Sequence, residues 1–255
     1  YGVISRPYAL MVAAMFLSTI TWKNRDIHPW KFVLSLVLLC FTSSFGIALA
    51  CGFALAWMWE SIRREGFGRL FTENPQRIVA LSVLLAVGVV LTLLVIPNQN
   101  ALAVQSAKIP LLRRAAQVLL ALPSESLVTS LTPEALLTTE TLPWTIILVC
   151  APISLMLFAM LLHLAWRQGN LPVLLLPTVM LSACFISYVA GHHQGIIFAF
   201  MLCTVWHNHA QQPNGPDDVP PTIRHWWYRH LDEVGDARRA STVRSLRCAV
   251  VLLLL

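Results

Sequence analysis

The chain has 255 residues, of which 57% are hydrophobic and only 12% are charged, and its mean hydropathy is +0.68. A soluble domain averages about 45–50% apolar and about 25% charged residues, so this composition excludes an ordinary soluble protein and indicates several membrane crossings. The net charge of +6 comes from short basic clusters between apolar segments, which is typical of membrane topology and not of nucleic-acid binding.

A membrane-spanning helix needs about 20 mostly apolar residues. In chain order, the predicted spans outside the segment 31–60 are 8–22, 78–97, 143–166, 172–190, 194–207 and a truncated one that starts near Cys248. The segment 31–60 is long for one span and short for two, and its centre, FTSSFG, is small and polar. Two crossings, 31–42 and 46–61, place 14 of the 18 basic residues on one face, whereas a single crossing divides them 12 to 6. Because cytoplasmic loops collect Lys and Arg, the sequence favours two crossings and about seven in total.

This topology assigns the connecting segments to two sides of the membrane. The predicted cytoplasmic segments are 23–31, 62–77, 167–170 and 208–247, and the predicted outer segments are 1–7, 42–46, 98–142 and 191–193. In the outer loop, IPLLRRAAQVLLAL is typical of an amphipathic helix on the membrane surface, and Thr132–Pro133 predicts a second helix start. We therefore predict an all-α polytopic bundle over 1–207, then a cytoplasmic loop 208–247 and the beginning of a cut-off span at 248–255.

The chain starts without a methionine and ends within CAVVLLLL, so we interpret it as an internal fragment of a longer protein. Its six cysteines lie in or beside apolar stretches without C-x-x-C spacing, which favours lipid-phase thiols over disulfides or a metal site. No cofactor motif is present, and no ligand set supports a divalent metal.

Two adjacent histidines, His192 and His193, interrupt the apolar stretch YVAGHHQGIIFAF at the outer end of two predicted spans. Their side chains would diverge by about 100° on a helix, and His207 and His209 lie a span away, about 20 Å, so one four-histidine site is disfavoured. Two interpretations stay open: the pair caps a helix at the headgroup level, or it lines an outward-facing cavity. In such a cavity an imidazole can contact a phosphate or sugar hydroxyl, or transfer a proton.

Other polar residues near the outer face are few. Arg6 is either a snorkelling arginine or a phosphate ligand, because a guanidinium binds phosphate through a planar fork of donors. The outer acidic residues Glu125, Glu134 and Glu140 are predicted to be solvated loop positions. Glu60 is predicted to be interfacial, and the predicted spans contain no carboxylate pair, which weighs against an ion-coupled transporter.

Three glycines lie within the predicted spans. We interpret Gly46, Gly52 and Gly88 as helix-packing contacts, because small residues let helices approach closely in a membrane.

The opening YGVISRPYAL resembles a segment of polytopic GT-C type glycosyltransferases, in which an Arg-x-Tyr element opens a span after an extracytoplasmic loop. The basic loop WKNRDIHPWK, the helix pair around CFTSSFGIAL and the turn GHHQG are also similar to that family. The resemblance covers residues 1–65 and, more loosely, 180–205.

The resemblance implies an enzyme of the bacterial inner membrane that transfers a sugar from a polyprenyl-phosphate donor to an acceptor outside the cytoplasm. Its partners would be this lipid-linked donor and membrane lipids, with no nucleic acid. Arg6 and Tyr8 match the Arg-x-Tyr element and His192 and His193 match loosely, all as substrate-binding residues. The catalytic acidic residue is unknown and is expected upstream of Tyr1.

Two other functions stay open. The first is a transporter, flippase or polymer-assembly permease without chemistry of its own. The second is a scaffold or sensor subunit that works through the tail 208–247.

Overall fold

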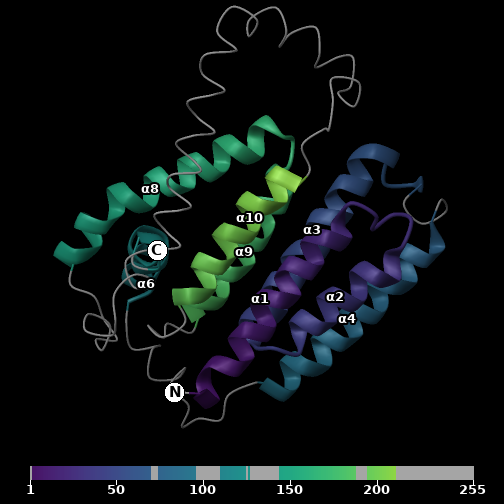
Figure 1. Cartoon of the computed structure of the whole chain (residues 1–255), viewed down its shortest axis with the longest axis horizontal. Helices are drawn as coiled ribbons and strands as arrows, with labels where there is room; N and C mark the ends of the chain where they lie inside the picture. Colours follow the sequence, from purple (N-terminus) through teal and green to yellow (C-terminus); the bar gives the residue numbers. More distant parts are fainter. Residues whose placement is uncertain are drawn as a thin grey trace, which may run out of the picture. The chain divides into compact units, whose positions relative to one another are not determined.

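The computed structural model describes residues 2–69, 74–95, 110–124, 126, 144–187 and 194–210. All regular elements within these ranges are helices, which confirms the predicted all-α class for this part of the chain. In chain order (Figure 1) they are α1 (Gly2–Trp22), α2 (Pro29–Cys40), α3 (Ser44–Glu65), α4 (Pro75–Val95), α6 (Leu111–Ala116), the π-helix η2 (Gln117–Ala121), α8 (Trp144–Arg167), α9 (Leu171–Ser187) and α10 (Gln194–Ala210).

The chain divides into two units, Tyr1–Gln211 and Gln212–Leu255, and every described residue belongs to the first. Most of the predicted loop 208–247 and the whole predicted span start 248–255 lie outside the described residues.

The segment 31–60 forms two helices, as the sequence predicted, because a tight turn separates α2 from α3. The Oγ1 atom of Thr42 donates a hydrogen bond to the Leu39 carbonyl (2.7 Å), and the Ser43 Oγ accepts one from the Gly46 N–H (3.2 Å) as the N-cap of α3. Gly46 is required there, since an added Cβ would lie 2.1 Å from the Leu39 oxygen. The 12 residues of α2 extend about 18 Å, which is less than the hydrocarbon thickness of a bilayer.

The number of long apolar helices is lower than the sequence predicted. Among the described residues, three helices are long and apolar enough to cross a membrane, namely α3, α4 and α8, against about seven predicted crossings. The described apolar parts of the other predicted spans are shorter: Tyr8–Trp22, Pro29–Cys40, Leu171–Ser187 and Gly195–Asn208. Several of the predicted spans, such as 8–22, 31–42 and 194–207, were already about this short, so the larger predicted number comes from counting each apolar run as one crossing.

Helices α3 and α9, far apart in the sequence, make a close backbone contact. A Cβ added to Gly52 would lie 2.3 Å from the Pro177 Cα, and the rings of Phe45 and Phe185 continue this contact with centroids 4.5 Å apart. The packing role predicted for Gly46 and Gly52 is therefore confirmed. For Gly88 the described residues contradict it, because none of their atoms lies within 4 Å of a Cβ built there.

The helices with the largest apolar exposure are α4 and α8. Only 17% of the apolar window of each is buried within the protein, against 50% for α3. Side chains such as Leu93 and Leu94 on α4 and Leu148 and Val149 on α8 are well exposed. Contiguous apolar surface of this kind is rare on a protein in water, and a lipid environment would cover it.

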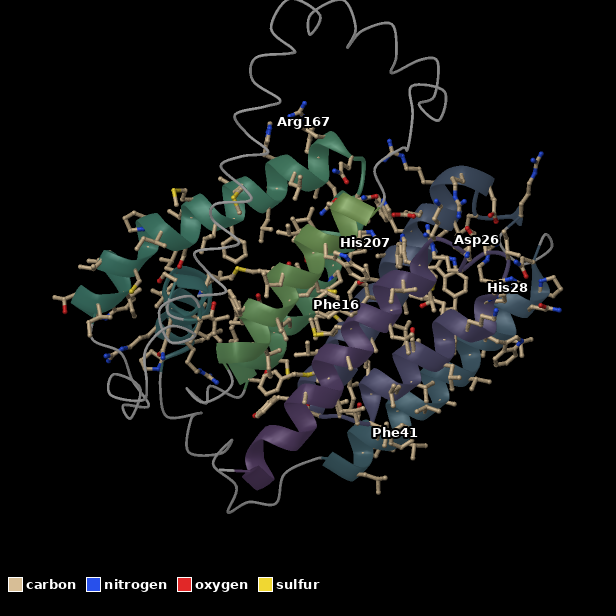
Figure 2. All side chains as sticks on the ribbon, viewed as in Figure 1. Phe16, Asp26, His28, Phe41, Arg167 and His207 are labelled. Atoms are coloured by element: carbon tan, nitrogen blue, oxygen red, sulfur yellow. The ribbon has the colours of Figure 1, made fainter. Side chains whose placement is uncertain are left out.

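Successive long helices run in alternating directions, so the helix ends gather at two ends of the bundle (Figure 1). We call one of them the basic end, because Asp26, His28, Arg167 and His207 lie there (Figure 2) together with most of the described basic residues. The opposite end contains the start of α1, the α2–α3 turn, the end of α9 and the start of α10.

Candidate functional site

The predicted site residues occupy the opposite end of the bundle as far as the structure describes them. Arg6 lies in the first turns of α1, and its side chain is outside the described part. Tyr8 is half-buried and packs against the hydrophobic core. His192 and His193 lie outside the described residues, between the end of α9 and the start of α10. Glu125, Glu134 and Glu140 also lie outside the described part.

The helix predicted to lie on the membrane surface is instead packed into the bundle. Leu111 and Leu112 in α6 are exposed, but the side chains of the following turns, Gln117, Val118 and Leu122, are buried. Ala121 of η2 packs against Ile147 and Cys150 of α8. The first turns of this segment, in α6, have an amphipathic pattern. The second half, from Gln117 onward, is mostly apolar and is buried against α8.

Arg114 fixes this helical segment to α9. Its Nη1 donates a hydrogen bond to the carbonyl oxygen of Ile186, at 2.8 Å. The last carbonyls of a helix have no partner within the helix, so an arginine is well suited to bind them. The Arg114 Nε is buried and has no hydrogen-bond partner in the described part of the chain. The guanidinium therefore lies at the end of α9 with hydrogen-bonding capacity left over.

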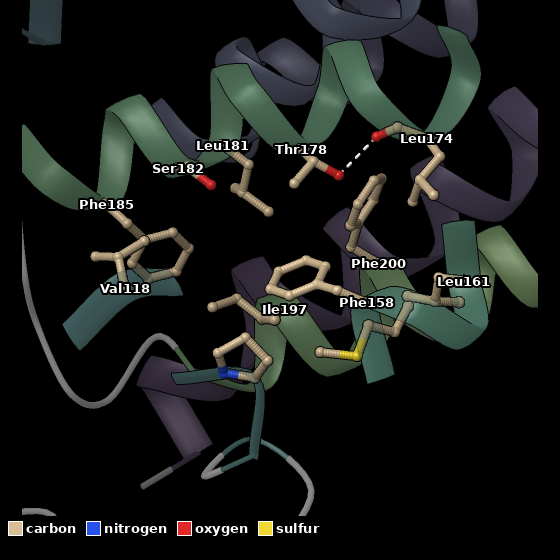
Figure 3. A pocket seen from close by; sticks show the side chains of 12 residues that line it. Val118, Phe158, Leu161, Leu174, Thr178, Leu181, Ser182, Phe185, Ile197 and Phe200 are labelled. Atoms are coloured by element: carbon tan, nitrogen blue, oxygen red, sulfur yellow. Dashed lines mark hydrogen bonds between the residues drawn. The ribbon is translucent and has the colours of Figure 1, made fainter. Parts of the chain in front are cut away.

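A small apolar cavity lies between η2 with the residues that follow it, α8, α9 and α10 (Figure 3). Val118 follows Arg114 by about one helical turn, and Phe185 precedes the Ile186 carbonyl that Arg114 binds. The hydroxyl of Thr178, one of the few polar groups of the lining, donates to the Leu174 carbonyl at 2.6 Å. The lining comprises Val118, Pro123, Phe158, Leu161, Leu174, Thr178, Leu181, Ser182, Phe185, Ile197, Phe200 and Met201.

The cavity volume is about 30 Å³, and the lining is almost entirely apolar. Such a lining suits a short piece of hydrocarbon chain and offers few hydrogen-bond partners to a sugar ring. Sequence reasoning counted Arg113 and Arg114 only as charges of an outer loop, and the signal for a site was an arginine pair within an apolar stretch.

The basic end contains a second polar cluster, built on the α1–α2 connection. The Asp26 carboxylate accepts hydrogen bonds from the Trp57 Nε1 (2.7 Å) and the Arg64 Nη2 (2.6 Å). Arg25 pairs with Glu60, and its guanidinium lies over the Trp22 ring, 3.9 Å from the centroid. Glu60, predicted to be interfacial, is thus an ion-pair partner. Figure 2 shows Asp26 and His28 at this end. These contacts tie the α1–α2 connection to α3.

His207 is also at the basic end and is almost fully buried. Its exposed fraction is 2%, and its ring meets the Trp22 ring edge-on with centroids 5.7 Å apart. Neither ring nitrogen has a hydrogen-bond partner in the described part of the protein. His207 therefore belongs to the α1–α10 packing at this end, and the histidines of the α9–α10 junction lie at the other end of α10.

The Asp26 contacts predict how stability depends on acid pH. Burial raises the pKa of Asp26, but the hydrogen bonds from Arg64 and Trp57 outweigh it and hold the pKa below the ordinary value of 3.8. A carboxyl whose pKa is lower in the folded state contributes stability that is present above its unfolded pKa and is lost as the pH falls through the folded pKa. We expect Asp26→Asn to be less stable than wild type near neutral pH and to lose less stability below about pH 4.

This prediction is checked by thermal unfolding in detergent between about pH 6 and about pH 2. The unfolding temperatures of wild type and Asp26→Asn, plotted against pH, should converge at the lowest pH. An acid slope in Asp26→Asn as steep as in wild type would contradict the assignment.

Among the described residues, no group of three or more His, Cys, Asp or Glu could hold a metal ion. The five cysteines in this part of the chain are free. No protein-family model, curated protein or solved structure matches the chain.

Proposed function

We propose that the protein is an integral membrane glycosyltransferase of the bacterial inner membrane, which takes a sugar from a polyprenyl-phosphate donor at the end opposite the basic end. The observation that carries the proposal is that Arg114 binds the Ile186 carbonyl, while Phe185 next to Ile186 and Val118 one helical turn after Arg114 line an apolar cavity. A cation near an apolar cavity is complementary to a lipid phosphate, whose head is anionic and whose tail is hydrocarbon.

The distribution of Lys and Arg indicates which end of the bundle would face the cytoplasm. Lys23, Lys31 and Arg63 are exposed at the basic end, and Arg25, Arg64 and Arg77 lie there as ion-pair partners. Segments rich in Lys and Arg face the cytoplasm, so the opposite end would face outward. In this proposal α1, α2, α9 and α10 complete the set of about seven crossings, with the short α2 packed between longer neighbours.

The proposed chemistry needs a cation at the phosphate leaving group, because negative charge develops there in the transition state. Arg114 would supply this cation, and Arg6 and Tyr8 at the start of α1 would contact the same headgroup. His192 or His193 would assist at the phosphate or at the acceptor hydroxyl. The cavity would hold only part of the lipid chain, so the sugar would lie at its water-facing mouth.

The test is sugar transfer by the full-length protein in liposomes from a radiolabelled polyprenyl-phosphate donor. Arg114→Ala is expected to lower the transfer rate about 100-fold, the effect of removing one donor that stabilises developing charge. Arg114→Lys should recover part of it, because charge is kept but the planar fork is lost. Arg63→Ala, an exposed arginine at the basic end, is the matched control and should transfer at the wild-type rate.

Arg6→Ala and the His192→Ala/His193→Ala pair are assayed beside Arg114→Ala, with thermal unfolding as the check on folding. Transfer at the wild-type rate by a folded Arg114→Ala would contradict the assigned role. No transfer by wild type, with movement of the lipid-linked sugar across the bilayer instead, would support the alternative, a transporter or flippase that uses the same recognition without chemistry.

A further inference from the structure

The connection between α1 and α2 holds some of its charges against α3 and leaves two lysines exposed. Arg25 pairs with Glu60 of α3, and the Asp26 carboxylate accepts hydrogen bonds from two other side chains of that helix. Lys23, directly after α1, and Lys31, at the start of α2, are exposed and make no ion pair within the part of the chain that the structure describes. Two cations are therefore left for a partner outside the protein.

Large apolar side chains are exposed between these two lysines. The exposed fraction is 72% for Ile27 and 46% for Trp30. A tryptophan prefers the headgroup level of a bilayer, because its indole combines an apolar body with an N–H donor. A lysine at this level can extend its ammonium group to the lipid phosphates. The combination is typical of a membrane interface and not of a loop in water.

Exposed tryptophans near the basic end also occur on two other helices. In each of three helices, an exposed leucine and an exposed tryptophan are four positions apart, which places them on one face, about 6 Å apart along the axis. The pairs are Leu34 and Trp30 in α2, Leu55 and Trp59 in α3, and Leu162 and Trp166 in α8. Because α2 begins at the basic end whereas α3 and α8 end there, the tryptophan of each pair is nearer to the basic end.

These tryptophans are not confined to one side of the bundle. Figure 2 shows His28 and Arg167, which are close in sequence to Trp30 and Trp166, on opposite sides of the basic end. On α8 a second exposed tryptophan, Trp144, precedes Trp166 by 22 positions. This is about 33 Å along the helix, close to the thickness of a hydrocarbon core. A patch for a single protein partner would lie on one side, so the arrangement favours a lipid bilayer.

We propose that Lys23 and Lys31 bind the headgroups of anionic phospholipids in the leaflet at the basic end, with Ile27 and Trp30 in the layer between headgroups and hydrocarbon. The two ammonium groups are complementary to a negative headgroup, and the apolar side chains beside them match a lipid and not a free anion. Each basic residue near an anionic lipid surface strengthens binding about fivefold. This contact is independent of sugar transfer and of Arg114.

The experiment measures lipid binding to the full-length protein in neutral detergent by native mass spectrometry. Phosphatidylglycerol is the anionic probe, and phosphatidylcholine is the zwitterionic one. Wild type is expected to prefer phosphatidylglycerol. Lys23→Gln/Lys31→Gln should bind it about tenfold more weakly than wild type does and should bind phosphatidylcholine equally well.

The matched control is Asn24→Ala/Gln76→Ala, which changes two exposed, neutral residues at the same end and should keep the wild-type preference. Because both lysines are exposed, the lysine variant should unfold at the wild-type temperature in detergent without added lipid.

Equal affinity of wild type for the two lipids, or of wild type and the lysine variant for phosphatidylglycerol, would overturn the role of the lysines. An equal loss of affinity for both lipids would also overturn it, since the substitutions would then alter the surface and not the recognition of charge. Binding of soluble poly-glutamate by wild type as tight as that of phosphatidylglycerol would indicate an acidic protein as the partner instead. Failure of the sugar-transfer assay would overturn the proposed function and leave this lipid contact in place.

Discussion

Gly52→Ala is expected to lower the free energy of unfolding by about 3 kcal/mol, the upper part of the usual range for overpacking. The added Cβ would lie 2.3 Å from the Cα and 2.7 Å from the N of Pro177, which are backbone atoms of α9. No side-chain rotation relieves such a contact, so α3 and α9 would have to separate. In a membrane this close approach is itself a main source of helix association, and its loss would also loosen the Phe45–Phe185 contact.

The matched control is the same substitution at Gly88 in α4, where no atom of the part of the chain that the structure describes lies within 4 Å of the new Cβ. Gly88→Ala should be neutral or stabilising by about 0.5–1 kcal/mol, because alanine favours the helix over glycine. Both variants are compared with wild type by thermal unfolding in detergent. Equal stability of Gly52→Ala and Gly88→Ala would mean that α3 and α9 do not pack through Gly52.

Arg77→Met is expected to lower the free energy of unfolding by about 2–3 kcal/mol, because it removes charge-assisted hydrogen bonds between a buried arginine and a carboxylate that is 20% exposed. The Arg77 side chain is 1% exposed, and its two Nη atoms donate to the two carboxylate oxygens of Glu65, with the Nη1 bond at 2.9 Å. Its Nη1 also lies 3.8 Å from the Asp26 carboxylate. Methionine would leave Glu65 without this partner at the junction of α3 and α4.

Arg63→Met is the control at the same end, because Arg63 is exposed and should tolerate the change within about 0.5 kcal/mol. The double variant Arg77→Met/Glu65→Gln should recover part of the stability lost in Arg77→Met, since the unpaired carboxylate is removed as well. If Arg77→Met unfolds at the same temperature as Arg63→Met, the Arg77–Glu65 ion pair contributes nothing to stability, which would contradict its assigned role at the basic end.

Helix positions followed from the apolar runs of the sequence. The predicted spans 78–97 and 143–166 became α4 (Pro75–Val95) and α8 (Trp144–Arg167), each within three residues at either end. The polar centre FTSSFG, together with the charge distribution, predicted the α2–α3 pair. The predicted crossing 31–42 became α2 (Pro29–Cys40), which ends two residues earlier because hydrogen bonds of the turn stop the helix there.

The tertiary contacts could not be predicted from the sequence. Gly52 and Gly88 both lie in apolar helices, and only the presence of Pro177 beside one of them makes their roles different. The Arg25–Glu60 pair joins residues 35 positions apart. Arg114 binds a carbonyl 72 positions away, so a count of loop charges could not distinguish it from a solvated arginine. The predicted residues Arg6, His192 and His193 were chosen as isolated polar groups, and their contacts stay predictions.

The central claim is that a lipid phosphate binds at the opposite end, with its head at Arg114 and part of its tail in the apolar cavity. The most direct measurement is photo-crosslinking of the full-length protein in liposomes with polyprenyl phosphate that carries a photoreactive group in the first units of its chain, followed by mass spectrometry of the labelled peptides. We predict label on peptides that contain Val118, Phe185 or Ile197, competed by unmodified polyprenyl phosphate and weakened in Arg114→Ala. Label confined to the exposed faces of α4 and α8, without competition, would contradict the claim, because those faces contact any membrane lipid.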